Sequence, residues 1–206
     1  SWTDPTLLAP GLFYPPDART PEARLRFYAS RFPMVEVDST YYALPTRRVA
    51  ELWAARTPAG FTFDVKAHAL LTGHPVEPKR LPRALRDPVP PSLAGANRIA
   101  GADVPEAARE LAWTLFLDAL APLVDAGKLG AILLQWPRDF RPTRAAADVL
   151  AAAREHVAGL DAAGVVGAVE FRHRDWYAAR LQTRTLALLE RLGLAHVVVD
   201  GPQGHA

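Results

Sequence analysis

The sequence contains no cysteine. This absence excludes disulfide bonds, thiolate nucleophiles, and zinc or iron–sulfur sites with cysteine ligands. Long apolar runs are missing too, since no stretch approaches the roughly 18 consecutive apolar residues that cross a bilayer. The first residues, Ser1 to Asp4, lack the basic-then-apolar pattern of a signal peptide. We therefore expect a cytoplasmic protein with no membrane partner.

An excess of charge of either sign is also lacking, because 24 Lys and Arg residues face 22 Asp and Glu residues. The overall charge therefore does not favour a nucleic-acid partner. The densest basic stretch is 79–86, and Arg47 and Arg48 form a second basic pair. These groups could contact phosphates, so a non-catalytic nucleic-acid or phosphate-ligand binding protein stays as an alternative to a solvated basic surface.

Half of the 206 residues are hydrophobic, which is enough to build the core of a single domain over residues 1–206. Apolar patterns and capping residues predict alternating strands and helices along the chain. The predicted strands are 34–40, 61–68, 129–135, 165–172 and 195–199, and the predicted helices are 20–32, 46–56, 105–123, 143–156 and 183–192. No hairpin turn separates the strands, so we expect a parallel sheet with crossover helices.

A proline-rich segment interrupts this plan at about 70–104. An irregular segment of that length is usually functional or disordered. We expect an ordered insertion that passes over one face of the domain.

Polar residues inside the predicted strands decide between two parallel folds. Glu36, Lys66 and Glu170 all alternate with apolar neighbours. In an open, doubly wound sheet these charges would be pressed under helices, whereas a closed barrel would direct them into its lumen, close to the end where such enzymes hold their active sites. The sequence therefore predicts a TIM-type (β/α) barrel.

Four motifs in order along the chain resemble those of the YecE-like family, catalogued as domain of unknown function 72. They are V-E-V-D-S-T-Y-Y at 35–42, F-D-V-K-A at 63–67, L-L-Q-W-P at 133–137, and E-F-R-H with Trp176 at 170–176. The resemblance implies a TIM-barrel-like fold but no established activity. The first strand and the last strands of that family have no counterpart here, so we expect either a fragment of a longer barrel or an incomplete barrel.

The polar residues at or near the carboxyl ends of the strands form a candidate site. Glu36 and Glu170 are candidate general acid and base, because two nearby carboxylates can be driven to different pKa values. Lys66 and Arg172 would hold an anionic group or a developing oxyanion. His173 would act as a further catalytic base, as a metal ligand or as a hydrogen-bonded loop residue. The candidate substrate-binding residues are Asp38, Tyr42, His68, Gln135, Trp136, Trp176 and Asp200.

This candidate site predicts that the protein binds a small sugar-like or phosphate-like molecule. As an enzyme it would be a hydrolase, lyase or isomerase acting on that molecule. Its alternative is a structural network of ion pairs, Glu36 with Lys66 and Glu170 with Arg172, that fills the barrel. The sequence does not identify a cofactor. A divalent metal is one option, with ligands drawn from His68, His74, Glu36, Glu170 and Asp200.

Overall fold

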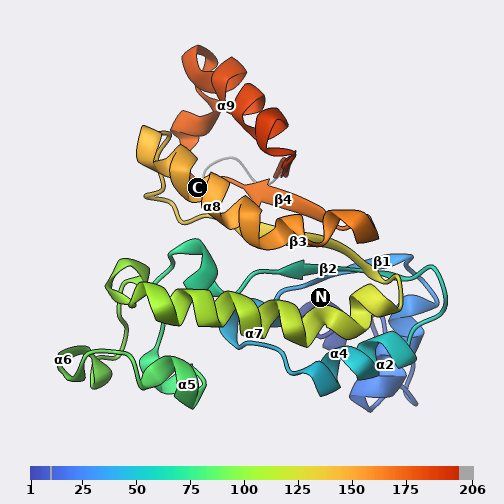
Figure 1. Cartoon of the computed structure of the whole chain (residues 1–206). Coiled ribbons are helices and arrows are strands. Elements are labelled where there is room, and N and C mark those ends of the chain that lie inside the picture. Colours follow the sequence, from blue (N-terminus) through green and yellow to red (C-terminus); the bar gives the residue numbers. More distant parts are fainter. Residues whose placement is uncertain (10, 200–206) are drawn as a thin grey trace.

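The computed structural model describes residues 1–9 and 11–199, and its strands and helices alternate as the sequence predicts. Five parallel strands form one sheet in the order in which they occur in the chain (Figure 1). The strands are β1 (Met34–Val37), β2 (Thr62–Lys66), β3 (Leu129–Gln135), β4 (Val166–Glu170) and β5 (Ala195–His196). The class is α/β with a parallel sheet.

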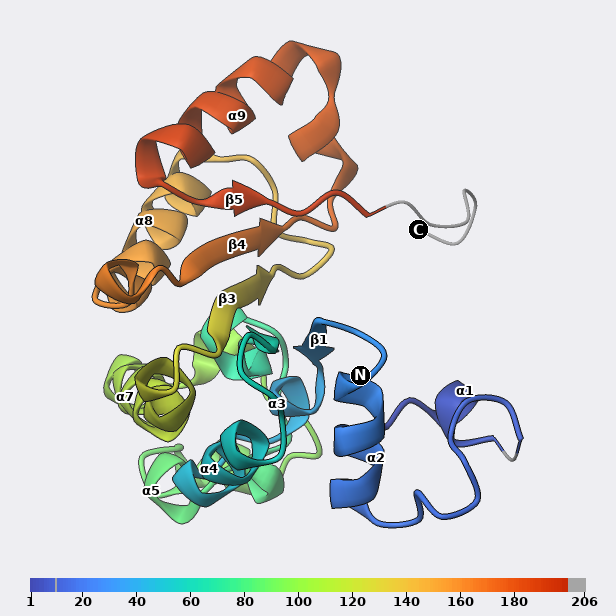
Figure 2. The ribbon, with the colours of Figure 1, turned by 90° about the vertical axis from the view of Figure 1, so that its right-hand side faces the viewer.

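The crossover helices lie together on one side of the sheet (Figure 2). They are α4 (Arg47–Ala55), α7 (Glu106–Asp125), α8 (Arg144–Ala158) and α9 (Ala179–Leu192), and α2 (Pro21–Ala29) precedes the first strand. The hydroxyls of Thr20, Thr46 and Thr143 accept the backbone N–H three residues on, and thereby cap α2, α4 and α8. These three helix starts confirm the capping signals in the sequence.

The two faces of the sheet differ in polarity. Val37, Val65, Leu134 and Val169 are fully buried beneath the helices. Alternation turns their neighbours to the other face, which no crossover helix covers. That open face is where the charged strand residues lie.

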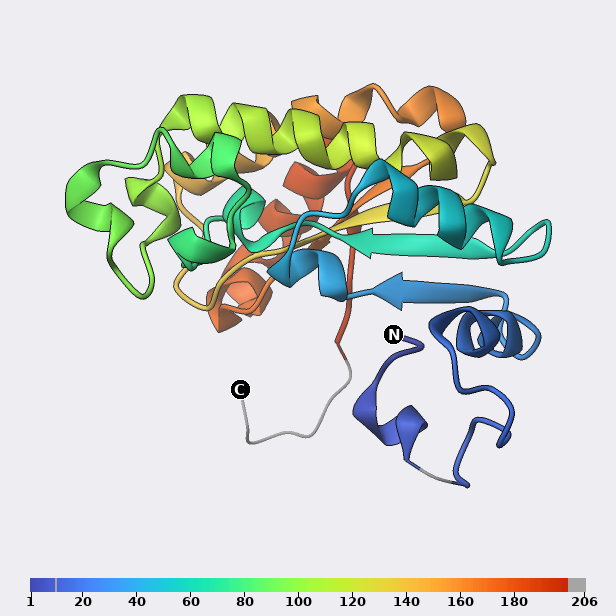
Figure 3. The same ribbon diagram turned by 90° about the horizontal axis from the view of Figure 1, so that it is seen from below.

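The sheet is not closed within the described residues, so the predicted barrel is not confirmed. β1 and β5 form its two edges, and β5 has two residues instead of the predicted five. Figure 3 shows β1 at the sheet edge, with the N-terminal segment beyond it. That segment contains the short helix α1 (Pro5–Leu8), and Trp2 is buried against Trp53, with ring centroids 5.7 Å apart.

The insertion after β2 is ordered, as expected. It contains the 3₁₀ turns η1 (Ala69–Thr72), η2 (Pro78–Arg80) and η3 (Gly101–Asp103), and the short helices α5 (Arg83–Arg86) and α6 (Pro91–Ala94). Its two ends meet at a neck, where Val76 and Ile99 exchange two backbone hydrogen bonds of 2.9 Å. A Cβ atom on Gly101 would lie 2.7 Å from the backbone of Gly73, so only glycine permits this approach.

Several other predicted boundaries are also wrong. The first strand ends at Val37 instead of Thr40, because residues 39–42 form the helical turn α3 (Ser39–Tyr42). The Thr40 hydroxyl anchors this turn through the carbonyl oxygens of Val37 (3.0 Å) and Lys66 (2.6 Å). Helix α9 begins at Ala179, four residues before the predicted Thr183, since nothing in that stretch interrupts a helix. No helix in the described part of the chain has the length and apolarity needed to cross a membrane.

Candidate functional site

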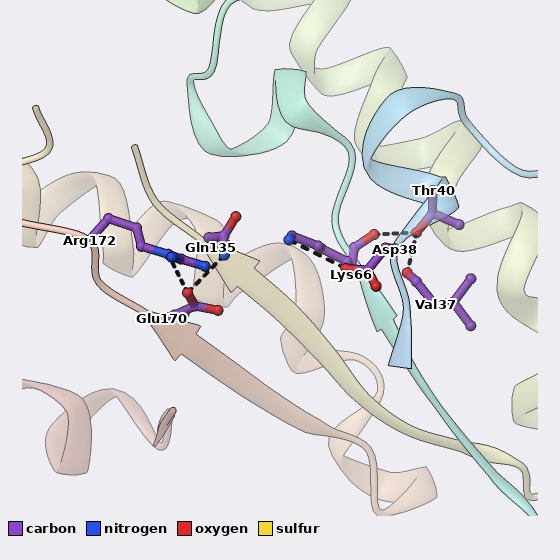
Figure 4. A network of polar contacts seen from close by, with 7 residues as sticks. All are labelled: Val37, Asp38, Thr40, Lys66, Gln135, Glu170 and Arg172. Carbon is purple, nitrogen blue, oxygen red and sulfur yellow. Dashed lines mark hydrogen bonds and ion pairs between the residues drawn. The ribbon is translucent and has the colours of Figure 1, made fainter. Parts of the chain in front are cut away.

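Glu170 ends β4 on the open face, and its carboxylate is bound twice (Figure 4). One of its oxygens accepts a hydrogen bond of 2.8 Å from the Gln135 side-chain amide, across the register that pairs these two residues in β3 and β4. The same oxygen pairs with the Arg172 guanidinium. Glu170 is only 5% exposed, so both partners offset the cost of burying a charge. The predicted pair of Glu170 and Arg172 is confirmed.

Lys66 ends β2 on the same face. Its ammonium lies 3.5 Å from a carboxylate oxygen of Asp38 and 5.3 Å from the centre of the Tyr41 ring, where the ring adds a cation–π attraction. The sequence predicted Glu36 as its ion-pair partner, and this was wrong. Asp38 takes that place because the chain leaves the strand at Val37 and turns into α3.

The Glu36 side chain on β1 keeps contact with solvent, but the pKa of its carboxyl group is raised. Desolvation among the surrounding groups is the main reason that its pKa rises to about 7. A hydrogen bond to Asp38 and repulsion by the Asp38 and Glu170 carboxylates act in the same direction, and Lys66 opposes them. Glu36 can therefore exchange a proton near neutral pH.

His68 and Tyr42 lie beside this cluster, against the insertion. His68 is 3% exposed; its Nδ1 accepts the Leu70 N–H (3.2 Å) and its ring also bonds to the Tyr42 backbone. Burial lowers the pKa of His68 to about 4, so the ring is neutral at pH 7. Both residues line a pocket of about 200 Å³, to which the insertion contributes Arg80 and Arg98. Arg98 could not be predicted as a wall of this pocket, because no local sequence pattern marks it.

The remaining predicted residues do not join the cluster. Trp136 is 3% exposed and stacks on Phe140, while Trp176 is 2% exposed and stacks on Phe171 at 4.0 Å. Both lie in the core. The Nδ1 atom of His173 accepts a backbone N–H at 3.1 Å and caps the 3₁₀ turn η5 (Arg174–Tyr177). Asp200 lies outside the described residues.

A metal site and a phosphate-binding surface are the alternatives that the sequence leaves open. Within residues 1–9 and 11–199, no three His, Asp or Glu side chains converge as a metal site would require. The basic surface groups have acidic neighbours: Arg48 pairs with Glu51 at 3.2 Å, and Arg80 pairs with Glu77 at 2.8 Å. These pairs reduce the positive charge available to a phosphate backbone.

Comparison with known proteins gives the chain a family. A family model described as "Protein of unknown function DUF72" matches residues 1–206. The UPF0759 protein YunF of Bacillus subtilis (strain 168) is 27% identical over 190 residues, which cover 92% of this chain and 56% of YunF.

Two solved DUF72 family proteins have similar folds. The protein from Enterococcus faecalis V583 is 24% identical, with a TM-score of 0.65 over 87% of this chain and 54% of its own. The protein from Thermotoga maritima MSB8 is 26% identical, with a TM-score of 0.60 over 91% of this chain and 59% of its own. The chain thus spans little more than half the length of these relatives. It belongs to the DUF72 family of proteins of unknown function.

Proposed function

We propose that the open face of the sheet binds a small polar or anionic molecule and that Glu36 and Glu170 carry out acid/base chemistry on it. One observation carries the proposal. Neighbouring strands place Glu36, Lys66, Gln135 and Glu170 on the same uncovered face, towards the carboxyl ends of the strands. Ligands of parallel α/β proteins bind at that end.

The two carboxyl groups have contrasting surroundings, as acid and base partners often do. Glu36 has a pKa of about 7 and can give or take a proton. Glu170 is buried and held by Arg172 and Gln135, which fix its orientation. Lys66 lies on β2, the strand between β1 and β3, and would attract an anionic substituent. This chemistry suits a hydrolase, lyase or isomerase.

We further propose that the five strands are part of a TIM-type barrel in a cytoplasmic protein. The parallel strands follow sequence order, and the crossover helices share one side. Both features are those of a barrel segment, and a full barrel takes about 250 residues. Closure would turn the open face into a lumen.

The test measures binding of inorganic phosphate, ribose 5-phosphate and citrate by isothermal titration calorimetry. At least one probe is expected to bind, and Lys66→Met, which removes the ammonium, should weaken its binding about tenfold or more. The matched surface control Lys79→Met should leave the affinity unchanged. The proposal fails if the folded protein binds none of these probes or if the control variant weakens binding as much.

A second titration addresses the nucleic-acid alternative. Single-stranded DNA is added at low and high salt to the original protein and to Glu170→Gln. Salt-sensitive DNA binding that persists in Glu170→Gln would favour the basic surface over the open face.

A further inference from the structure

A second cavity lies on the helix side of the sheet, outside the site described above. It has a volume of about 500 Å³, within the range typical of small-molecule sites. Helices α7 and α8, neighbours in Figure 1, form its walls, and the segment after β3 and the turn η1 form its floor.

Each helix contributes one continuous stripe of side chains, with the i, i+3, i+4, i+7 spacing of a single helical face. The stripes are Glu106, Arg109, Glu110 and Trp113 on α7, and Val149, Ala152, Ala153 and His156 on α8. The two central residues of the α8 stripe are alanines, whose side chains are small. The space between the helices is therefore not filled by the chain itself.

Four aromatic residues are among those that line the cavity. Trp113 and His156 stack with ring centroids 4.7 Å apart and join the two helices. Trp136 and Phe140 form a second stack, at 4.3 Å, in the floor. Flat apolar surfaces of this kind suit a planar ring, and the faces of Trp and Phe rings also attract cations.

The side chains that line the cavity carry a net negative charge. Glu106, Glu110 and Asp139 contribute three carboxylates, of which Glu110 lies 3.3 Å from the His156 ring, whereas Arg109 contributes a single guanidinium. That guanidinium already donates to the backbone carbonyl of Val104 at 2.8 Å. The lining therefore favours a cationic ligand over an anionic one.

We propose that this cavity binds a planar aromatic molecule carrying a protonated amine. The ring lies against the aromatic lining, and the ammonium faces the carboxylates of α7. The site is separate from the open face, so the inference does not depend on the proposed function.

Two probes with the same ring and opposite charge test this site. Tryptamine carries an ammonium on an indole, and indole-3-acetate carries a carboxylate. Binding is followed by ¹H–¹⁵N chemical-shift changes and calorimetry. Tryptamine is expected to bind about tenfold or more tightly than indole-3-acetate, a difference of about one decade in Kd. Equal affinity of the two probes, or no binding of either, would overturn the proposal.

A cavity-filling variant locates the site. Ala152→Phe places a ring in the cavity from an exposed position of α8 and should reduce tryptamine binding at least about tenfold. Ala145→Phe is the matched control, because Ala145 is exposed on the same helix but does not line the cavity. Glu106→Gln should narrow the preference for tryptamine over indole-3-acetate. Unchanged binding in Ala152→Phe would show that the probe binds elsewhere and refute the assignment.

Discussion

Replacing His68 with asparagine is expected to reduce the loss of stability that acid causes. His68 is buried, and its Nδ1 accepts the N–H of Leu70 at the start of η1. Asparagine is a favoured N-cap residue and can accept the same N–H. It does not titrate, however, and it loses the bond from the ring to the Tyr42 backbone.

The size of the effect follows from the pKa of the buried ring. Burial lowers the pKa of His68 from 6.5 to about 4, so the native ring stays neutral where the unfolded chain takes up a proton. The unfolded state therefore binds more protons in this window, and the free energy of unfolding falls as the pH falls from 6.5 towards 4. At about 1.4 kcal/mol for each pKa unit, the group accounts for a loss of about 3 kcal/mol.

Urea unfolding followed by circular dichroism, between about pH 7.5 and about pH 4.5, measures this loss. His68→Asn should be about 1–2 kcal/mol less stable at neutral pH because a hydrogen bond is lost. On acidification it should then lose about 3 kcal/mol less than the original protein. Ala69→Gly is the control: it weakens the same turn but keeps the imidazole, and so should retain the full acid effect. Equal acid losses in His68→Asn and the original protein would refute the reasoning.

Three other predictions, two of them substitutions, test separate features. Lys128→Met should lower the free energy of unfolding by about 2–4 kcal/mol, as measured by urea unfolding. The buried ammonium donates to the carbonyl oxygens of Ala54 at 2.6 Å and Thr57 at 2.7 Å, and the variant leaves both without this donor. The exposed control Lys79→Met should change the free energy of unfolding by at most about 0.5 kcal/mol. Gly101→Ala should open the neck of the insertion, since the new Cβ would lie 2.7 Å from Gly73; unchanged hydrogen exchange at the neck amides would contradict this. The Glu36 carboxyl should titrate in NMR with a midpoint of about 7, mainly through desolvation, and a normal carboxylate midpoint would disprove it.

Alternation along the strands was enough to predict which charged residues share a face. Glu36, Lys66 and Glu170 all lie on the face that the sequence assigned to them. The partner of Lys66 could not be predicted in this way. Alternation holds only while the strand continues, and Asp38 already has a helical backbone, with φ −84° and ψ −22°.

The positions of the aromatic residues depended on packing beyond the strands. Trp136 continues the alternation of Ile132 and Leu134, which face the helices, so its burial was readable from the sequence. Trp176 follows an irregular segment, and its place is set by a hydrogen bond of 2.7 Å to the carbonyl oxygen of Phe140. Such a contact between distant segments leaves no local pattern. Whether a sheet closes equally depends on contacts between distant strands, which alternation within a single strand does not predict.

Because Val76 and Ile99 join the two ends of the insertion at the neck, the length of the insertion does not affect the geometry of the sheet. Once the two ends are joined, the entropy of closing a loop rises only with the logarithm of its length, by about 0.6 kcal/mol for each doubling. The exposed residues between them can therefore lengthen, shorten or change sequence at little thermodynamic cost, whereas Leu81, Leu85 and Val89 are buried in the hydrophobic core and anchor the segment to the domain. The same segment supplies Arg80 and Arg98 to the pocket beside Lys66. A change in this insertion would therefore alter the walls of that pocket while the strands and their charged residues stay the same.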